Sequence, residues 1–312
     1  MKSITTLILF LAVGLAMGQQ TEYVYRNPAD STYNCYLTVL PASGVVKGLI
    51  VRDYSSLPKV KGNRPYPYKW KKMALENGIA ILYTVSSTFF PELCYNDSNL
   101  MLMDEMINEV VARHAIPKQN IFIGGISASG ARALKYAQFC EMGKSKFDVK
   151  IRGVFSVDSP LDLERFYNSV HWNKAKFKEG MLWEAELMTK VFPERMDGTP
   201  QTQLEAYQLR SVYSHTHANG GNAKYLLNTP VIFFHEPDID WWIEERGATY
   251  YDINSFDIAG LYNYLKIKGH RDVELISTSG KGFDRKGIRK CHSWTIVGEE
   301  YLIGWILERM DF

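Results

Sequence analysis

The sequence predicts an α/β protein with a mostly parallel central sheet and helices on both of its faces. Three observations favour this fold class. Short runs of β-branched and apolar residues alternate with longer amphipathic stretches. The short runs are apolar at nearly every position, as expected for parallel strands covered on both sides. About 290 residues follow a distinctive N-terminal segment, which is enough for one large domain with a substantial core.

Seven strands and three long helices are expected outside the middle of the chain. The strands are predicted at residues 36–40, 47–52, 79–84, 120–124, 153–157, 230–235 and 273–278. The helices are predicted at residues 99–114, 253–268 and 293–310. Strands that alternate with helices in this way are typical of a parallel sheet built from right-handed crossovers.

The segment between residues 161 and 228 breaks this alternation. It contains no convincing strand, whereas residues 163–169, 180–191 and 201–212 have helical patterns. We therefore predict a helical cap that is inserted into the domain and lies above the carboxyl ends of the strands. Such a cap would control access and selectivity. The alternative is a long crossover without a special role.

The first 18 residues are predicted to be a cleavable signal peptide. Lys2 supplies a positive charge, residues 7–15 form an apolar core, and Ala16 and Gly18 are small residues at the expected cleavage positions. The apolar stretch is shorter than the roughly 20 residues of a transmembrane helix. We expect a secreted or periplasmic protein with no stable membrane anchor, and a retained anchor is the alternative.

Composition excludes several classes of function. The formal net charge of +2 over 312 residues gives no basic surface of the kind that nucleic-acid-binding proteins need. The sequence contains no dinucleotide or phosphate-loop motif and no metal-ligand spacing, so no cofactor or metal is expected. In an oxidising compartment its four cysteines could form up to two disulfides, in any of three full pairings: Cys35, Cys94, Cys140 and Cys291. The pattern does not indicate an oligomeric state.

The predicted strand at 120–124 is followed directly by a turn that carries Ser127 and then by a helix of small residues. A serine at the tip of such a turn has a strained backbone, and strand and helix almost touch around it. The residues two before and two after the serine must therefore be small, and Gly125 meets the first requirement. The segment resembles the nucleophile elbow of the α/β hydrolases, which implies that Ser127 is the nucleophile.

The elbow departs from the usual G-x-S-x-G pattern at one position. Ser129 stands where the second glycine is usual, and a glycine follows at Gly130. Serine is still small enough to fit. The resemblance implies two oxyanion donors, the first being the N–H of Ala128, which follows the nucleophile. The second should come from the loop after the strand at 47–52, and we choose the N–H of Tyr54. This residue could equally be a wall of the pocket.

In this superfamily the order along the chain is serine, acid, histidine, each on its own loop. His292 lies between the last predicted strand and the last predicted helix, where the family keeps its general base. The base must reach the serine hydroxyl with Nε2 while the acid holds Nδ1–H. The other six histidines lie in the predicted cap, at the end of a strand or beside helices: His114, His171, His215, His217, His235 and His270.

The acid is expected in the loop after the strand at 230–235. The usual spacing points to position 239, which is an isoleucine, so Asp238 lies one residue early and Asp240 one late. We prefer Asp238, because a proline fixes the turn before it and it is nearer the end of the strand. Asp158, after the preceding strand, is a further alternative that some lipase-like relatives use.

Three further segments resemble those of a group of exported bacterial serine hydrolases of the esterase and peptidase type: residues 236–242, 280–282 and 292–294. Residues 19–312 would form the α/β-hydrolase domain with its insertion. The resemblance implies acyl transfer to water. A small-molecule carboxylic ester is the preferred substrate. An acylated saccharide is one candidate, because of the predicted export and because Trp241 and Trp242 could stack on a sugar ring or line an acyl pocket. For these two residues, however, core packing or a structural aromatic pair is the preferred interpretation.

Two alternatives stay open. A peptidase of the same fold that recognises a free amine would need acidic residues in the cap, and Glu184, Glu186 and Glu194 are candidates. A catalytically inactive domain used for binding is the second alternative, because a fold alone does not determine function.

Overall fold

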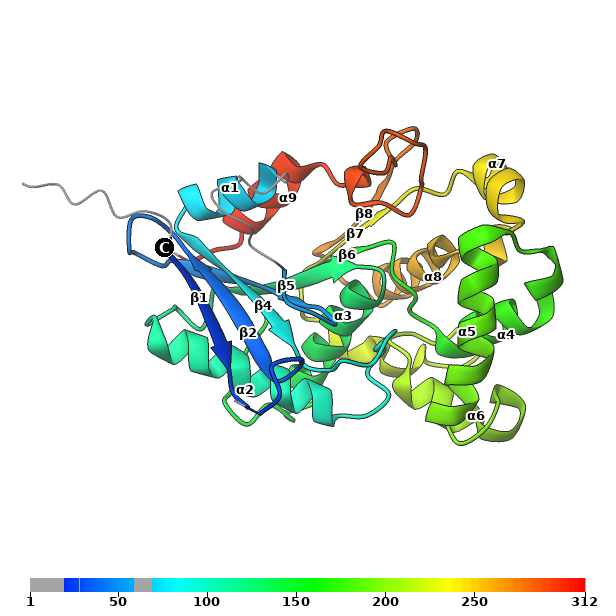
Figure 1. Cartoon of the computed structure of the whole chain (residues 1–312), viewed down its shortest axis with the longest axis horizontal. Coiled ribbons are helices and arrows are strands. Elements are labelled where there is room, and N and C mark those ends of the chain that lie inside the picture. The colour runs from blue at the N-terminus through cyan, green and yellow to red at the C-terminus, as the bar shows by residue number, and fades with distance from the viewer. Residues whose placement is uncertain (1–19, 28, 59–68, 312) are drawn as a thin grey trace, which may run out of the picture.

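The computed structural model describes residues 20–27, 29–58 and 69–311. Within these ranges eight strands form one sheet in the order β1-β2-β4-β3-β5-β6-β7-β8, which confirms the predicted fold class (Figure 1). Strands β3 to β8 run parallel to one another, and β1 and β2 are antiparallel to their neighbours. The strands are β1 (Gln20–Tyr25), β2 (Cys35–Leu40), β3 (Gly48–Asp53), β4 (Ile79–Val85), β5 (Ile121–Ile126), β6 (Gly153–Val157), β7 (Val231–His235) and β8 (Val273–Ser277). The predicted signal peptide lies outside the described residues.

Strands β2 to β8 confirm the seven predicted strands, whereas β1 was not predicted from the sequence. β1 is an edge strand that pairs only with β2, and its residues are exposed or half-buried. Its polar sequence therefore lacks the apolar run by which the buried strands are detected. The inner strands β2, β3 and β4 are buried at every position, which is why the same criterion finds them.

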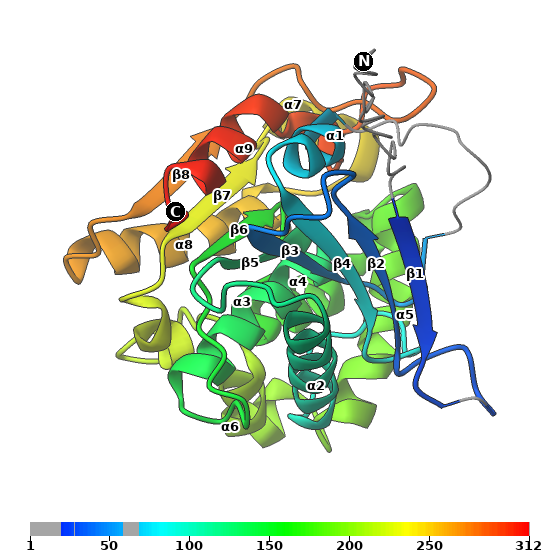
Figure 2. The ribbon, with the colours of Figure 1, turned by 90° about the vertical axis from the view of Figure 1, so that its left-hand side faces the viewer.

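Helices cover both faces of the sheet (Figures 1 and 2). α1 (Lys69–Glu76) and α9 (Glu299–Leu307) share a core that includes Trp70 and Trp305. On the opposite face, α2 (Ser98–Arg113), α3 (Ala128–Glu141) and α8 (Asn254–Ile267) pack around a larger core. The predicted C-terminal helix at 293–310 is too long, because a short 3₁₀ turn, η5 (Trp294–Ile296), and two extended residues precede α9.

The insertion between β6 and β7 contains helices joined by loops, and no strand is found in it among the described residues. It comprises α4 (Leu163–Asn173), η1 (Lys174–Lys176), α5 (Glu179–Arg195), α6 (Pro200–Arg210) and η2 (Gly221–Leu226). Figure 1 shows α4, α5 and α6 grouped on one side of the sheet. Buried Arg165 of α4 donates from Nε to Asp257 of α8 at 2.8 Å, which ties the insertion to the main domain. Short helices α7 (Ile239–Trp241), η3 (Trp242–Arg246) and η4 (Tyr250–Asp252) follow β7.

The structure also bears on the cysteines and on membrane spans. Cys35, Cys94, Cys140 and Cys291 are all free thiols, so neither of the two disulfides that the sequence allows is present. Within the part of the chain that the structure describes, no helix has the length and apolar character needed to cross a bilayer.

Candidate active site

Ser127 lies at the junction of β5 and α3 in a backbone conformation that few residues adopt. Its φ of 58° and ψ of −134° place it in a sharp turn, and its N–H donates to Val157 O of the next strand at 2.9 Å. A Cβ on Gly125 would overlap Ser129, and one on Gly130 would overlap Ser159. Strand and helix thus approach as closely as the nucleophile elbow requires, and the side chain of Ser127 is left half-exposed.

The serine that departs from the family pattern has a structural use. Ser129 Oγ donates to the carbonyl oxygen of Asp53, at the end of β3, at 2.6 Å. Arg132, one turn later in α3, forms an ion pair with the Asp53 carboxylate at 2.7 Å and donates to Glu92 O at 3.0 Å. These contacts are buried and join the elbow to the neighbouring strand end, so the substitution of glycine by serine adds an anchor for the turn.

His292 is held by Asp158. Its Nδ1 lies 2.6 Å from Asp158 Oδ2, and Asp158 follows β6 directly. The Asp158 side chain is 5% exposed and that of His292 is 31% exposed. The N–H of Asp158 donates to Phe234 O at 2.8 Å, and Asn254 Nδ2 donates to Asp158 O at 2.9 Å. This arrangement favours the tautomer in which Nδ1 carries the proton and Nε2 is free to accept one.

The environment of His292 favours its charged form. Burial lowers the pKa of His292, but the charge of the Asp158 carboxylate and its hydrogen bond raise it by more. Glu184 adds to the increase, and Lys290 opposes it. The net effect is a pKa above the ordinary value of about 6.5. A histidine whose imidazolium form is stabilised in this way is suited to accept a proton from a nucleophile.

The sequence-based choice of Asp238 as the acid is not supported by this geometry. Asp238 Oδ1 accepts from Trp241 N at 3.2 Å, and Oδ2 accepts from Arg289 Nη2 at 2.7 Å. The hydrogen bond from Arg289 lowers the pKa of Asp238. Asp240 is exposed. The hydrogen-bond partner of His292 is instead Asp158, which the sequence offered only as a further alternative.

The loop after β7 has a different use, which is to hold the loop that carries His292. The Glu236 side chain is fully buried and accepts from Thr278 Oγ1 at 2.8 Å, Lys281 N at 2.9 Å and Gly282 N at 3.2 Å. Arg289 forms an ion pair with it. Burial raises the pKa of Glu236, but these hydrogen bonds lower it by more, so the group stays ionised.

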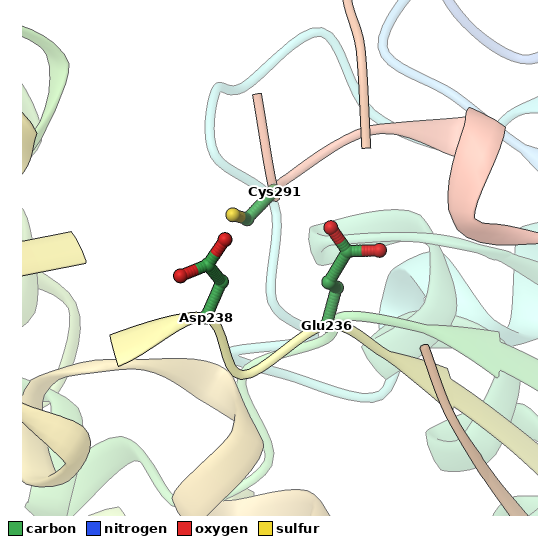
Figure 3. Close-up of side chains that lie close together, drawn as sticks. All are labelled: Glu236, Asp238 and Cys291. Atoms are coloured by element: carbon green, nitrogen blue, oxygen red, sulfur yellow. The ribbon is translucent and has the colours of Figure 1, made fainter. Parts of the chain in front are cut away.

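Three metal-ligand residue types meet at the same place. Figure 3 shows Glu236 and Asp238 facing the segment of Cys291, with the thiol pointing toward Asp238. One potential ligand atom of each residue lies within 4.8 Å of the other two. Arg289 already supplies a cation to both carboxylates. Burial raises the pKa of the Cys291 thiol to about 12, which keeps it protonated at neutral pH. We interpret this cluster as a structural anchor.

The structure is consistent with one of the two predicted oxyanion donors and excludes the other. Ala128 is the first residue of α3, where backbone N–H groups have no partner within the helix, and it lines a cavity beside Ser127. The N–H of Tyr54, in contrast, donates to Thr84 O at 2.9 Å and is therefore not available. Tyr54 is a wall of the cavity, which was the alternative interpretation. The next residue, Ser55, lines the same cavity.

Two adjoining cavities meet at Ser127. The smaller, of about 150 Å³, contains Tyr54, Ser55 and Ala128 in its wall. The larger, of about 390 Å³, is lined by His292. Both are bounded by the same five residues: Phe90, Ser127, Pro160, Phe166 and Glu184. No hydrogen bond joins the described side chains of Ser127 and His292. Such contacts are often long in unliganded enzymes and shorten with substrate.

Residues of the insertion and of the segment after β7 complete the larger cavity. Trp183 and Glu184 of α5 line it, and so do Trp241 and Trp242. Of the three acidic residues considered for amine recognition, Glu184 alone faces a described cavity at Ser127, whereas Glu186 and Glu194 are exposed.

The sequence matches no protein-family model and no curated protein. Solved structures do match. The acylaminoacyl peptidase of Pyrococcus horikoshii has a TM-score of 0.57 and 15% identity, over 94% of this chain and 42% of that one. Carboxyl esterase 2 of Tuber melanosporum has a TM-score of 0.59 and 11% identity, over 96% and 89% of the two chains. Esterase B of Lactobacillus rhamnosis has a TM-score of 0.59 and 10% identity, over 93% and 86%.

The chain has the α/β-hydrolase fold. It spans about two-fifths of the length of the acylaminoacyl peptidases that it matches, and most of the length of the two esterases. Reasoning from the sequence had offered Asp158 only as a further alternative for the acid, and it had not singled out Ser55, which lines the smaller cavity. The available signal for Asp158 was its place directly after β6, next to the strand that carries the nucleophile.

Proposed function

We propose that the protein is a serine hydrolase that cleaves carboxylic esters. Ser127 is the nucleophile, His292 the general base and Asp158 the residue that orients the imidazole. The observation that carries this proposal is the 2.6 Å contact between His292 Nδ1 and buried Asp158, made beside a cavity that His292 and the strained Ser127 both line. Ser127, Asp158 and His292 have the residue types that acyl transfer uses and follow one another along the chain in the order serine, acid, histidine, although the acid follows β6 rather than β7.

The mechanism follows from this arrangement. Ser127 Oγ attacks the carbonyl carbon of the ester, and His292 Nε2 takes the hydroxyl proton. The N–H groups of Ala128 and Ser55 stabilise the negative charge on the carbonyl oxygen. The tetrahedral intermediate expels the alcohol, which leaves with the proton from His292. Water then attacks the acyl enzyme with the same help from His292, and the acid is released while Ser127 recovers its proton.

The two cavities indicate where the alcohol and acyl parts of the ester bind. Because His292 protonates the leaving alcohol, this group belongs in the larger cavity that His292 lines, and the acyl group belongs on the side of Ala128 and Ser55. Trp241 and Trp242 line this cavity and pack edge to face, and since Trp242 is only 8% exposed, contact with a ring-shaped alcohol such as a sugar falls mainly to Trp241. Export directed by residues 1–18 would bring the enzyme to such substrates outside the cytoplasm.

Two observations support an active esterase over the alternatives. Both esterases compared here are matched over most of their own length, whereas the peptidase is matched over 42% of its chain. Ser127 is half-exposed in a cavity, while a binding domain without catalysis would not require an accessible serine. A peptidase would use the same three residues, and a panel of matched ester and amide substrates separates the two activities.

Labelling with a fluorophosphonate probe tests the proposal. Wild-type protein should react, and labelling should be lost in Ser127→Ala and His292→Ala. Exposed Ser43 and His217 provide the matched controls, because Ser43→Ala and His217→Ala should label as wild type does. Folded wild-type protein that fails to label would contradict the proposal and favour a binding domain.

A further inference from the structure

Glu184 is an acidic residue that the proposed mechanism does not use, although it lies beside the reacting centre. It extends from α5 and lines both cavities, as Ser127 does. Glu184 and His292 line the same larger cavity, and the charge of Glu184 raises the pKa of His292. A carboxylate thus lies in the wall of both cavities, at the site proposed for the reaction.

The Glu184 side chain is half-buried and has no partner among the described residues. No hydrogen bond or ion pair involves it in the part of the chain that the structure describes. Burial is the main reason that the pKa of Glu184 is raised, and the charges of His292 and Arg165 only partly oppose this. A carboxylate that is partly desolvated and unpaired is costly, and its place in a cavity beside Ser127 favours a cationic group supplied by the substrate.

Aromatic residues line the same cavities as Glu184. Phe90 and Phe166 line both cavities with it, and Trp183, its neighbour in α5, packs on Phe90 with ring centroids 6.2 Å apart. Faces of aromatic rings attract ammonium groups. A carboxylate together with several aromatic rings therefore suits a protonated amine better than it suits a neutral or an anionic group.

The position of Glu184 indicates where the amine must lie in the substrate. The scissile carbonyl carbon has to lie at Ser127, where the two cavities meet, and Glu184 lies at the same junction. An amine on the carbon next to this carbonyl would remain at the junction, whereas an amine farther out would enter one cavity or the other. This geometry selects an α-amino group.

We propose that the substrate is an α-aminoacyl ester whose free protonated amine is bound by Glu184. This inference rests on the proposed esterase function and adds the class of acyl group to it. The acyl cavity of about 150 Å³ is lined by Leu93, Pro91 and Phe90. A cavity of this volume accepts a group about as large as benzene, so the aminoacyl group would carry one side chain of modest size.

Two esters that differ only in the charged group test this inference. Alanine benzyl ester carries the α-ammonium group, and lactic acid benzyl ester carries a hydroxyl in its place. Release of benzyl alcohol is measured at pH 7, below the ordinary α-amino pKa of about 7.7–8.0. Wild-type enzyme should prefer the alanine ester in kcat/KM by a factor on the order of 10 to 100, the usual effect of a hydrogen bond between charged groups.

The variant Glu184→Gln keeps the shape of the side chain and removes its charge. The preference for the alanine ester should then fall to within about 3-fold, whatever the absolute rates. Exposed Glu186, two residues along α5, is the control, and Glu186→Gln should keep the wild-type preference. An unchanged preference in Glu184→Gln, or a wild type that prefers the lactate ester, would overturn the inference.

Fluorophosphonate labelling of Ser127 separates this test from that of the proposed function. Wild-type enzyme that labels and hydrolyses the lactate ester as fast as the alanine ester would disprove amine recognition and leave the serine hydrolase intact. Wild-type enzyme that does not label would contradict the serine hydrolase itself.

Discussion

An acidic residue follows each of the neighbouring strands β6 and β7, and the two residues have different roles. Asp158 directly follows β6, and Glu236 directly follows β7. Asp158 accepts from the imidazole of His292, whereas Glu236 accepts from the backbone at Lys281 and Gly282 in the loop that precedes His292. One carboxylate therefore orients the ring, and the other holds the segment on which the ring stands.

Adjacency explains why either strand end could reach the histidine. β6 and β7 are paired in parallel, and paired strands lie about 4.8 Å apart, so the residues that follow them are neighbours. The difference arises in the backbone. Asp158 has a φ of 44° and is held by Phe234 and Asn254, which fix its position beside His292. Asp238 is two residues farther along its loop, 33% exposed, and bound to Arg289.

The largest expected effect is the difference between these two aspartates in catalysis. Asp158→Asn should lower kcat toward an ester by a factor on the order of 10³ to 10⁴, because the imidazole loses the acceptor that fixes its tautomer. Asp238→Asn should change kcat by less than about 10-fold, since this carboxylate acts on Arg289 and not on the ring. Initial rates with p-nitrophenyl butyrate measure both.

Thermal melting of each variant shows whether the rates refer to folded protein. If Asp238→Asn lost more activity than Asp158→Asn while both stayed folded, the contact of His292 with Asp158 would not be the catalytic one. The assignment would then return to the loop after β7.

A smaller effect concerns stability and separates the two acidic residues of the β7 loop. Glu236→Gln should lower the free energy of unfolding by about 1–3 kcal/mol, because a fully buried carboxylate with charge-assisted hydrogen bonds is lost. Asp238→Asn should cost no more than about 1 kcal/mol, since its ion pair with Arg289 is partly exposed. Urea denaturation compares the two, and a reversed order would show that Asp238 is the main anchor.

Most of the fold could be predicted because its strands are buried on both faces. Strands such as β4 and β7 are apolar at nearly every position, and this pattern locates them within one or two residues. β1 was not predicted because an edge strand next to solvent needs no such pattern. The C-terminal helix was predicted too long because a 3₁₀ turn and a helix can carry the same apolar periodicity.

The site could be predicted only where a local pattern specifies it. The sharp turn at Ser127 could be located because such a turn needs small residues at fixed positions. The acid could not be decided in this way, since it depends on how the loop before His292 folds. Lys281 and Arg289 of this loop bind Glu236, which lies more than 40 residues earlier in the chain. The second oxyanion donor failed for a similar reason, because the N–H of Tyr54 is taken by Thr84 of the neighbouring strand.

The smallest expected effect is a shift in the pH dependence of the reaction. It tests whether Asp158 or Asp238 sets the pKa of His292. Ester cleavage requires neutral His292, so kcat/KM should rise with pH through the pKa of this residue, and in the wild type the midpoint should lie above pH 6.5. Burial lowers the pKa of His292 and the Asp158 carboxylate raises it by more. Asp158→Asn removes the carboxylate charge and leaves the burial unchanged. The pKa of His292 should therefore fall, and the midpoint should move to lower pH.

Because the Asp158→Asn variant turns over slowly, the rate of fluorophosphonate labelling between pH 5 and 9 is the suitable readout for this shift. Asp238→Asn is the matched control and should nearly keep the wild-type midpoint, since Asp238 is not among the main charges that shift the pKa of His292. A midpoint that moves in Asp238→Asn and stays constant in Asp158→Asn would mean that the loop after β7 sets the charge of the base. The residue after β6 would then not orient the imidazole, and this role would belong to the loop after β7.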